Sequence, residues 1–425
     1  MLKGINIRRF KSVHDARVEF GRINLFIGGN GSGKSNLLEA IGVLAAALSR
    51  GISDDDLARK GVRLTPPALM KSAFKGGKIP ATLRLEADFD SALSYAMELT
   101  ATDASPSLSF FTENARHGTK RLFGRSGAGS TVFGQRLKRE PEGGRGLWDQ
   151  TRLSYEYDDG AARQFDALGR YAIYAPQTEF LRESRTGTVS DPPIGLHGEG
   201  LAQAVAGLLQ QRRALKDKGI SKGWDQVNDA FSLVKLPNWV QGVRVGPINS
   251  SLRSRGIAPT EGNIVYFLDS FMHEKRRTLS AYDSSEGTLF LLFIGVLLGH
   301  AQAPKIFALD NVDSALNPKL TRQLIERMVT MIKRKQEHGL ATGPDQIFMT
   351  SHNPTALDAF DLFDPDQRVF VAARDGKGRT TVDRLKPRDG MTREEWRSAT
   401  KGRNLSQMWI DGDIKGALGV SGDTL

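Results

Sequence analysis

The segment "GGNGSGKS", residues 28–35, places a lysine and a serine directly after a glycine-rich loop. Its spacing fits G-x-x-x-x-G-K-[ST], with the preceding apolar run and following helical pattern that this motif requires. Backbone N–H groups of such a loop hold phosphates, the lysine neutralises the β- and γ-phosphates, and the hydroxyl ligates Mg²⁺. A chance glycine turn would not need this context. The sequence therefore predicts a nucleoside triphosphate site formed by Gly28, Asn30, Gly31, Ser32, Gly33, Lys34, Ser35 and Asn36.

A second candidate group lies in "FALDNVDSALNP", residues 307–318, where an apolar run ends at Asp310. A strand-end aspartate beside Ser35 would hold Mg²⁺ through water. Asn311 stands where enzymes built this way usually carry a glutamate that activates water. An amide can orient water but cannot accept its proton, so the roughly 10²–10⁴-fold contribution of a general base is lost. We expect slow hydrolysis, with Asp313 as a candidate substitute base.

A histidine follows the apolar run in "QIFMTSHNP", residues 346–354. At the end of a strand, His352 would reach the γ-phosphate and act as its sensor. A lone histidine is also a common structural residue, and this alternative stays open. We expect the catalytic group to be Asp310, Asn311 and His352.

Strand and helix patterns around these segments indicate an α/β fold. Residues 5–20 alternate between apolar and polar with a break near Ser12, which predicts a hairpin. The final third alternates between strands and crossover helices, which predicts parallel strands: helix 286–300, strand 305–310, helix 318–338, strand 346–350, helix 354–360 and strand 368–373. The other expected elements are strands at 81–89, 151–159 and 170–177, a helical region at 198–234 and short helices in the tail.

Five segments in this order, "NIRRFKSV", "GGNGSGKS", "DSSEGTL", "ALDNVDSALNP" and "TSHNP", resemble the ABC-class ATPase heads of the RecF, SMC and OLD group. The resemblance implies an AAA-family P-loop NTPase of ABC-ATPase type: a mixed sheet flanked by helices, with an inserted, partly helical region. We expect an N-terminal ATPase lobe at 1–100, an insertion and helical region at 101–260, a C-terminal ATPase lobe at 261–385 and a helical tail at 386–425. We expect no fused nuclease of the OLD kind, because only about 50 residues of this sequence follow residue 375.

The resemblance also implies ATP and Mg²⁺ as ligands and assigns further site residues. Ser285 and Gly287 stand in the signature loop that binds the ATP of a second copy, and the 314–317 loop also acts across that dimer. Ser285 is at the same time an expected N-cap of helix 286–300, and a purely structural cap is the alternative. Gln177 is a candidate magnesium contact, with an ordinary surface glutamine as the alternative. Near the adenine we expect Arg9, Phe10 and Lys11.

The composition adds a basic charge and no thiol chemistry. The chain carries a net charge of +11, which favours a polyanionic partner, and it has no cysteine for disulfides, thiolate metal sites or nucleophilic catalysis. Its longest apolar run, residues 289–299, is shorter than the roughly 20 residues of a membrane span, so we expect a cytoplasmic protein without membrane contact.

Residues 104–147 are glycine-rich and basic and are expected to form a mobile insertion. Its cations are candidates for contact with nucleic acid or an acidic protein, a solvated loop being the alternative: Arg116, Lys120, Arg121, Arg125, Arg136, Lys138 and Arg139.

These features predict an ATP-binding, slowly hydrolysing ATPase that dimerises on ATP and acts as a switch. Nucleic acid or a separately encoded effector would read the closed state, in DNA repair or anti-phage defence. A membrane-transporter ATPase subunit is one alternative, although the long insertion and the sequence "DSSEGTL" fit it poorly. A non-hydrolysing structural or DNA-tethering protein is another, but the long heptad repeats of a tether are absent from the sequence.

Overall fold

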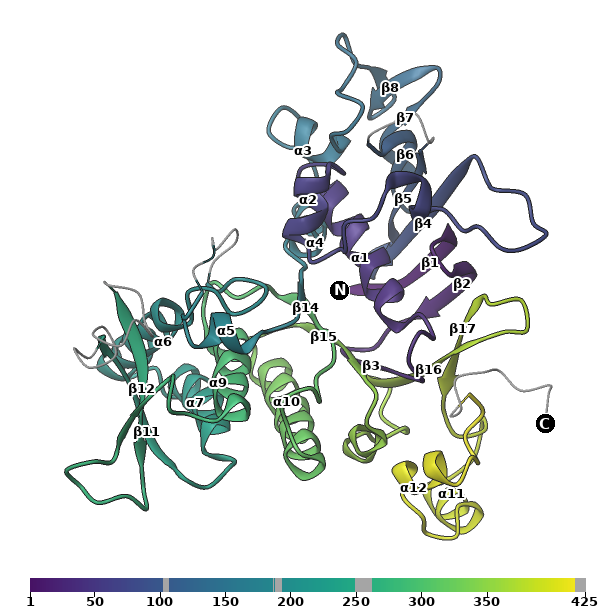
Figure 1. Cartoon of the computed structure of the whole chain (residues 1–425). Coiled ribbons are helices and arrows are strands. Elements are labelled where there is room, and N and C mark those ends of the chain that lie inside the picture. The colour runs from purple at the N-terminus through teal and green to yellow at the C-terminus, as the bar shows by residue number, and fades with distance from the viewer. Residues whose placement is uncertain (102–106, 186, 188–192, 249–261, 417–425) are drawn as a thin grey trace. The chain divides into compact units, whose positions relative to one another are not determined.

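The computed structural model describes residues 1–101, 107–185, 187, 193–248 and 262–416. The chain divides into two compact units (Figure 1). The first unit comprises Met1–Ile173, Ile306–Asp310 and Gln346–Leu425, and the second comprises Tyr174–Lys305 and Asn311–Asp345. Each unit is described by itself below.

A six-stranded sheet of the first unit has the order β10-β14-β15-β3-β16-β17. Its inner strands β14, β15, β3 and β16 run parallel, and β17 pairs with β16 in the antiparallel direction. Strands β3, β14 and β15 are buried along their whole length, as apolar strands covered on both faces should be. The predicted parallel strands are confirmed as β14 (Ile306–Leu309), β15 (Gln346–Ser351) and β16 (Gln367–Arg374), and the apolar run before the glycine-rich loop is β3 (Ile23–Ile27). The strand predicted at 170–177 is present only as the short β10 (Ile173–Tyr174), and the antiparallel β17 (Thr380–Leu385) was not predicted.

An eight-stranded antiparallel sheet of the same unit has the order β2-β1-β4-β5-β6-β7-β8-β9. The predicted hairpin at 5–20 and strand at 81–89 are confirmed as β1, β2 and β4. In β4 and β5 buried apolar residues alternate with more exposed residues, which is the pattern of a half-buried antiparallel sheet. Its strands are β1 (Leu2–Phe10), β2 (Val13–Glu19), β4 (Thr82–Phe89), β5 (Leu93–Thr100), β6 (Ser109–His117), β7 (Lys120–Ser126), β8 (Gly129–Val132) and β9 (Gln135–Arg136).

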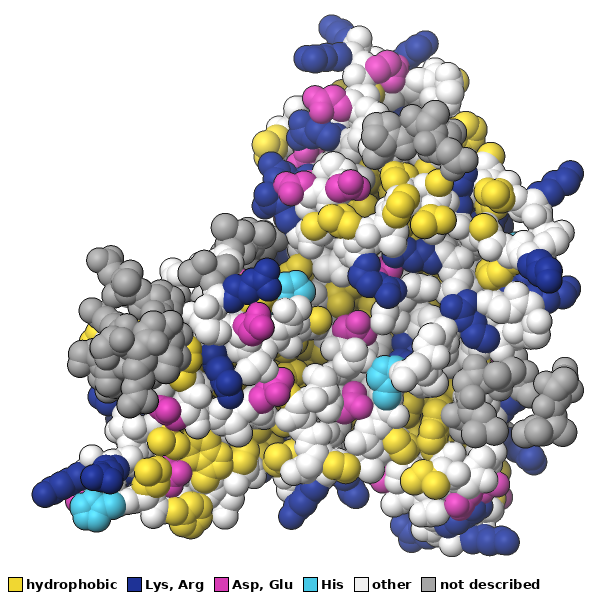
Figure 2. Space-filling view, viewed as in Figure 1, with side chains coloured by type: hydrophobic (Ala, Val, Ile, Leu, Met, Phe, Trp, Pro, Cys, Tyr) yellow, Lys and Arg dark blue, Asp and Glu magenta, His cyan; other side chains and the backbone are white. Residues whose placement is uncertain are grey.

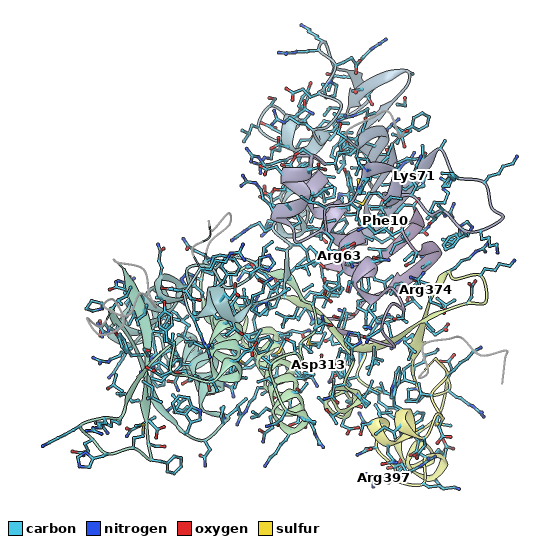
Figure 3. All side chains as sticks on the ribbon, in the orientation of Figure 1. Phe10, Arg63, Lys71, Asp313, Arg374 and Arg397 are labelled. Carbon is cyan, nitrogen blue, oxygen red and sulfur yellow. The ribbon has the colours of Figure 1, made fainter. Side chains whose placement is uncertain are left out.

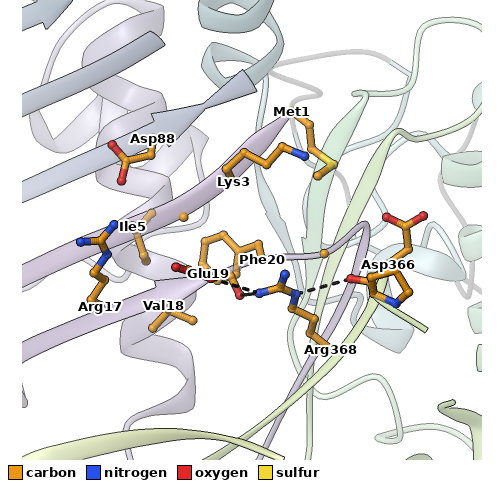
Figure 4. Close-up of a pocket in the computed structure, with 13 residues that line it drawn as sticks. Met1, Lys3, Ile5, Arg17, Val18, Glu19, Phe20, Asp88, Asp366 and Arg368 are labelled. Carbon is orange, nitrogen blue, oxygen red and sulfur yellow. Dashed lines mark hydrogen bonds and ion pairs between the residues drawn. The ribbon is translucent and has the colours of Figure 1, made fainter. Parts of the chain in front are cut away.

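Helix α1 (Lys34–Ser49) contacts strands of both sheets, β1 and β4 on one side and β15 on the other. Fourteen of its 16 residues are buried, including Glu39. The ring of Phe20, which follows β2, lies 4.9 Å from that of Phe348 in β15 and so connects the two sheets, and within the six-stranded sheet the Phe26 ring is stacked 5.1 Å from that of Phe370. Beside them, Arg368 Nη1 donates to Glu19 O at 2.9 Å, at the edge of a polar notch (Figure 4).

The expectation of a mobile insertion at 104–147 is wrong, because residues 109–136 form strands β6 to β9; residues 102–106 of this stretch lie outside the described part of the chain. A buried carboxylate, Glu113, stabilises this meander. It accepts hydrogen bonds from Tyr95 Oη at 2.9 Å and from Leu147 N at 2.9 Å, and it pairs with Arg125 at 3.1 Å. Burial raises the pKa of Glu113 to about 7, although Arg125 favours its charged form. Arg125, expected on the surface of a basic loop, is therefore a buried residue.

The strand expected at 151–159 is also wrong, since this stretch joins helix α3 (Leu147–Thr151) to helix α4 (Asp159–Gly169). Its tyrosines pack as side chains of an aromatic cluster instead of alternating across a sheet. Tyr157 lies 4.9 Å from the Trp148 ring and 5.1 Å from the Phe133 ring. Three further short helices lie between α1 and β5: α2 (Asp54–Arg59), η1 (Pro67–Met70) and η2 (Asp90–Ala92).

The second unit contains the predicted helical region and a three-stranded antiparallel sheet of order β11-β12-β13. Helix α9 is apolar on all sides and buried, as expected for a core helix. None of the helices within the described ranges is long and apolar enough to cross a membrane. The elements are α5 (Thr178–Leu181), α6 (Leu201–Asp217), α7 (Ser221–Ser232), η3 (Leu233–Lys235), β11 (Val240–Pro247), β12 (Asn263–Asp269), β13 (Thr278–Ser280), α9 (Glu286–Gly299) and α10 (Pro318–His338).

The tail forms two short helices, α11 (Arg393–Ala399) and α12 (Leu405–Ile410), that belong to the first unit. Asp358 in η4 (Pro354–Ala359) accepts bonds from Ser406 N at 2.9 Å and Ser406 Oγ at 2.6 Å. The two compact units therefore do not follow the four predicted segments. Strand pairing places residues 109–136 with the N-terminal lobe, and tail contacts place α12 there too.

Candidate nucleotide-binding site

The glycine-rich loop lies between the fully buried strand β3 and the start of helix α1. Two of its glycines are required by packing. A Cβ at Gly28 would collide with Ala372 O of β16, and one at Gly33 would collide with Thr380 Oγ1 of β17. Gly33 also has φ 102°, a backbone conformation that side-chain-bearing residues rarely adopt. The loop is thus fixed against two strands that lie more than 330 residues later in the sequence.

Lys34 is almost completely buried, and its ammonium group turns back over the loop. Its Nζ donates to Gly28 O at 2.9 Å and Gly29 O at 3.0 Å and lies 3.2 Å from His352 Nδ1. Ser32 Oγ is buried and has no hydrogen-bond partner among the described residues. A phosphate would give the buried hydroxyl of Ser32 a hydrogen-bond partner, and it would replace the loop carbonyls as the partner of Lys34. Both observations fit a phosphate-binding loop.

Asp310 follows strand β14, and its carboxylate accepts hydrogen bonds from two hydroxyl groups. Ser35 Oγ lies 3.2 Å from both carboxylate oxygens, and Thr350 Oγ1 donates to Oδ1 at 2.5 Å. Hydroxyl and carboxylate oxygens are the ligands that Mg²⁺ prefers, so this group fits the ion that the motif implies. Thr350 was not expected from the sequence. It lies two residues before His352, at the end of the strand that neighbours β14, and that position could have indicated it.

A buried charge cluster below the loop was also missed by the sequence analysis. Glu39 on α1 is paired with Lys11 Nζ at 2.5 Å and with Arg63 Nε at 2.5 Å. Burial lowers the pKa of Lys11, although the negative charge of Glu39 acts to raise it. The hydrogen bond to Glu39 raises the pKa of Arg63, and the charge of Asp310 makes a smaller contribution in the same direction. Figure 3 labels Arg63 on the first unit. The cluster connects the "RFKS" segment to the helix that begins at the loop.

Hydroxyl and amide groups extend this connection to the loop itself. Arg63 Nη2 donates to Asn36 Oδ1 at 2.9 Å, and Asn36 Nδ2 donates to Ser12 Oγ at 2.6 Å. Ser12 Oγ lies 2.8 Å from Thr380 Oγ1, which donates to Ser32 O at 2.9 Å. Asn36, expected to contact the nucleotide, is therefore engaged in positioning the loop in this structure.

Of the three residues expected near the adenine, Phe10 has a side chain that is buried in this structure. Its ring has 0% exposure and lies in the core, because β1 ends there with its apolar face inward. Arg9 and Lys11 both have left-handed backbone angles, with φ 62° and φ 48°. Arg9 Nη2 pairs with Glu98 at 3.2 Å, while Lys11 turns to Glu39. A different side chain reaches the loop, since Arg374 Nε donates to Gly31 O at 2.8 Å.

In the second unit, Ser285 is the N-cap of α9, as predicted, and its hydroxyl accepts from Thr288 N at 3.3 Å. Its side chain is exposed. Gly287 packs against the 314–317 loop of the same chain, where an added Cβ would lie 2.8 Å from Ala315 O. Asn317 caps α10 by accepting from Leu320 N at 3.0 Å. Gly287 thus has a packing function in its own subunit that the sequence did not reveal.

Asn311 has a left-handed backbone, with φ 57°. Asparagine tolerates this conformation better than most residues that carry a side chain, so local geometry favours an amide at this position independently of catalysis.

Gln177, the candidate magnesium contact, belongs to the second unit and precedes α5, where its N–H donates to His197 O at 2.8 Å. Within the described ranges no three His, Asp or Glu side chains gather as a metal cluster would require.

Comparison with known proteins finds similarity to ATPases. A family model described as an AAA domain, putative AbiEii toxin, Type IV TA system, matches residues 153–358, and an AAA ATPase domain model matches residues 1–74. The DNA replication and repair protein RecF of Magnetococcus marinus is 32% identical over 137 residues, which are 32% of this chain and 28% of RecF. RecF of Nostoc punctiforme is 42% identical over 62 residues, 14% of this chain and 17% of that protein. The chain thus matches less than a third of the length of these relatives.

Among solved structures, an SMC head bound to the C-terminal winged-helix domain of ScpA has a TM-score of 0.51 at 12% identity. The match covers 92% of this chain and 99% of the SMC head, and it shows a shared fold. Fold, motifs and family models together define a P-loop ATPase head of the ABC class. The RecF matches and the shared fold of the SMC head support the resemblance to RecF and SMC heads. Such an ATPase family implies ATP as the ligand and usually Mg²⁺ with it.

Proposed function

We propose that the chain binds Mg-ATP at Gly28–Ser35 and acts as an ATP-gated switch. Two copies would close around two nucleotides, and nucleic acid or a separately encoded effector would read the closed state, in DNA repair or anti-phage defence. The observation that supports this proposal most is the convergence of Lys34 on His352 and of Ser35 and Thr350 on Asp310. The RecF relatives are described as DNA replication and repair proteins, which favours DNA over an unrelated partner.

In the proposed site, Lys34 exchanges its bonds to Gly28 O and Gly29 O for the β- and γ-phosphates. Ser32 Oγ gains the partner that it lacks among the described residues. Ser35 and Asp310 hold Mg²⁺, which would stabilise the negative charge that develops on the phosphate oxygens. His352 then contacts the γ-phosphate, and its 3.2 Å contact with Lys34 couples the sensor to the lysine.

Lys34→Ala should abolish ATP binding, because it removes a buried ammonium group that lies directly over the phosphate loop. Isothermal titration calorimetry with ATP and Mg²⁺ measures this effect. The matched control is Lys78→Ala, which removes the same charge from an exposed position of the first unit and should bind like the wild type. Unchanged affinity in Lys34→Ala would refute the proposed site.

Asn311→Glu should accelerate hydrolysis, by up to about 10²-fold, because a carboxylate can accept the proton of water and an amide cannot. The gain is reduced by the left-handed backbone at this position, which glutamate tolerates less well than asparagine. Phosphate release at saturating ATP is the measurement. Asn311→Gln lengthens the side chain without adding a base and should stay slow. A wild type that already turns over many times per second would show that another base, such as Asp313, is active.

Ser285 allows a sharper test of dimer closure than Gly287, whose substitution would strain its own subunit. Ser285→Asp and Ser285→Asn both keep an N-cap acceptor for Thr288 N, so α9 should stay intact in both. Only the aspartate places a negative charge against the phosphates of the opposite nucleotide. Light scattering with a non-hydrolysable ATP analogue should show dimers of wild type and Ser285→Asn and monomers of Ser285→Asp. Equal association of the three proteins would mean that Ser285 is only a helix cap.

Net charge alone does not locate a nucleic-acid surface, since the Lys and Arg side chains on the face in Figure 2 are scattered among acidic and apolar ones. One arrangement on the polar face of the eight-stranded sheet is more specific. Arg116 of β6 and Arg121 of β7 are directly paired across the strands and have no acidic partner among the described residues. Both line a hollow of about 230 Å³ with Arg84 and Arg125, whose charges are engaged by Glu86 and Glu113. Like charges placed opposite each other destabilise a sheet, and a phosphate would relieve their repulsion.

The double variant Arg116→Gln/Arg121→Gln should therefore weaken binding to duplex DNA and reduce the slope of log affinity against log salt by about 1–2. Binding should depend little on base sequence, because arginines on a strand face contact the backbone. Fluorescence anisotropy over a salt series measures both quantities. Arg397→Gln removes an exposed charge from α11, outside the sheet, and serves as control. If the double variant keeps the wild-type slope, the hollow does not contact DNA.

A further inference from the structure

The second unit contains a cavity of about 360 Å³ that is separate from the residues of the phosphate loop. Residues of the helices α6 and α7, the short helix η3 and the strand β11 line it. Figure 1 labels α6, α7 and β11 in this unit. Its volume falls in the range of pockets that hold small organic ligands, roughly 300–1,000 Å³. The lining residues are Leu209, Arg212, Arg213, Asn228, Phe231, Val234, Lys235, Gln241, Gly242 and Val243.

The charges of this cavity have one sign. Arg212, Arg213 and Lys235 line it, and none of the described lining residues carries a carboxylate. The acidic residue next to Asn228 on α7, Asp229, is engaged by Arg334 of α10 instead. Three cations around one cavity repel each other unless an anion enters, so the site favours a ligand of concentrated negative charge.

The guanidinium of Arg212 is held in place by an aromatic ring. It lies over Phe231, 5.5 Å from the ring centroid, and Phe231 is itself buried. A guanidinium attracted to a ring in this way can still donate its N–H groups in bidentate hydrogen bonds. This geometry suits a phosphate group better than a single-point anion, because two parallel N–H donors match two phosphate oxygens.

The remaining lining groups suit a flat polar ring attached to that phosphate. Leu209, Val234 and Val243 provide apolar walls, and the amides of Asn228 and Gln241 can each donate and accept hydrogen bonds. Arg277 Nη1 donates to Gln241 Oε1 at 3.3 Å, so the NH₂ group of Gln241 remains as a donor for a ligand. Base edges present this mixture of donors and acceptors.

We propose that this cavity binds a nucleoside monophosphate unit, with its phosphate on Arg212, Arg213 and Lys235 and its base between the apolar walls and the two amides. The unit is either a free mononucleotide or the 5′-phosphorylated end of a single strand, since both present the same chemistry. The site is independent of the proposed ATP site, because the two sets of residues do not overlap.

Calorimetry of the full-length protein with uridine monophosphate tests the free nucleotide, and 5′-phosphorylated against 5′-hydroxyl tetrathymidylate tests the strand end. Arg212→Gln and Lys235→Gln should each weaken binding of whichever probe binds by about tenfold or more, since each removes a charge-assisted hydrogen bond. Lys235 is exposed and its substitution leaves the core intact, so a loss of binding there cannot be ascribed to unfolding. Lys216→Gln, on the same helix as Arg212 but outside the cavity, should bind like the wild type.

Lys34→Ala separates this proposal from the ATP site. It should retain binding of the monophosphate probe while losing ATP, and Arg212→Gln should show the opposite pattern. Loss of monophosphate binding in Lys34→Ala would assign that ligand to the phosphate loop and overturn the proposal. So would wild-type protein that binds neither uridine monophosphate nor the 5′-phosphorylated strand, or an Arg212→Gln variant that binds as the wild type does.

Discussion

The burial of helix α1 between two sheets is the constraint on which the rest of the first unit depends. A helix that contacts β1 and β4 on one side and β15 on the other cannot shift without disturbing both sheets, so its first residue, Lys34, is fixed with it. Burial also places Glu39 in an apolar environment, where an unpaired carboxylate would be costly. Lys11 and Arg63 neutralise it, and the same two residues connect the β1–β2 turn and the segment after α1 to the helix. Packing and electrostatics therefore fix the same helix end.

Much of the fold could be predicted because its elements carry local signals. The strands of the parallel sheet are continuous apolar runs, and α10 begins at a capping Asn317 and ends before Gly339. Lys34, Ser35, Asp310 and His352 were found because each sits in a short motif at a strand end. Parallel strands present these ends at one edge of the sheet, so the motifs meet there although 275 residues separate Ser35 from Asp310.

What the sequence did not reveal depends on contacts between distant residues. Strands β6 to β9 contain glycines and charges that look like a loop, and only their pairing and the burial of Glu113 with Arg125 make them a sheet. Phe10 lies in a basic segment, yet the left-handed turns at its neighbours direct it into the core. A glycine at position 287 is expected for a signature motif, but it is also required by the close contact with Ala315 O in the same chain. The motif alone cannot distinguish these two reasons.

Strand β3 pairs with β15 on one side and β16 on the other, and Thr380 of β17 holds Ser32. None of these partners exists when the ribosome has made the loop, and more than 300 further residues must emerge before they do. The antiparallel sheet, whose strands follow one another within the first 136 residues, can assemble much earlier. The phosphate loop can therefore become competent only after strands β15 to β17 have been synthesised, so a nascent chain would form its antiparallel sheet long before it could bind a nucleotide.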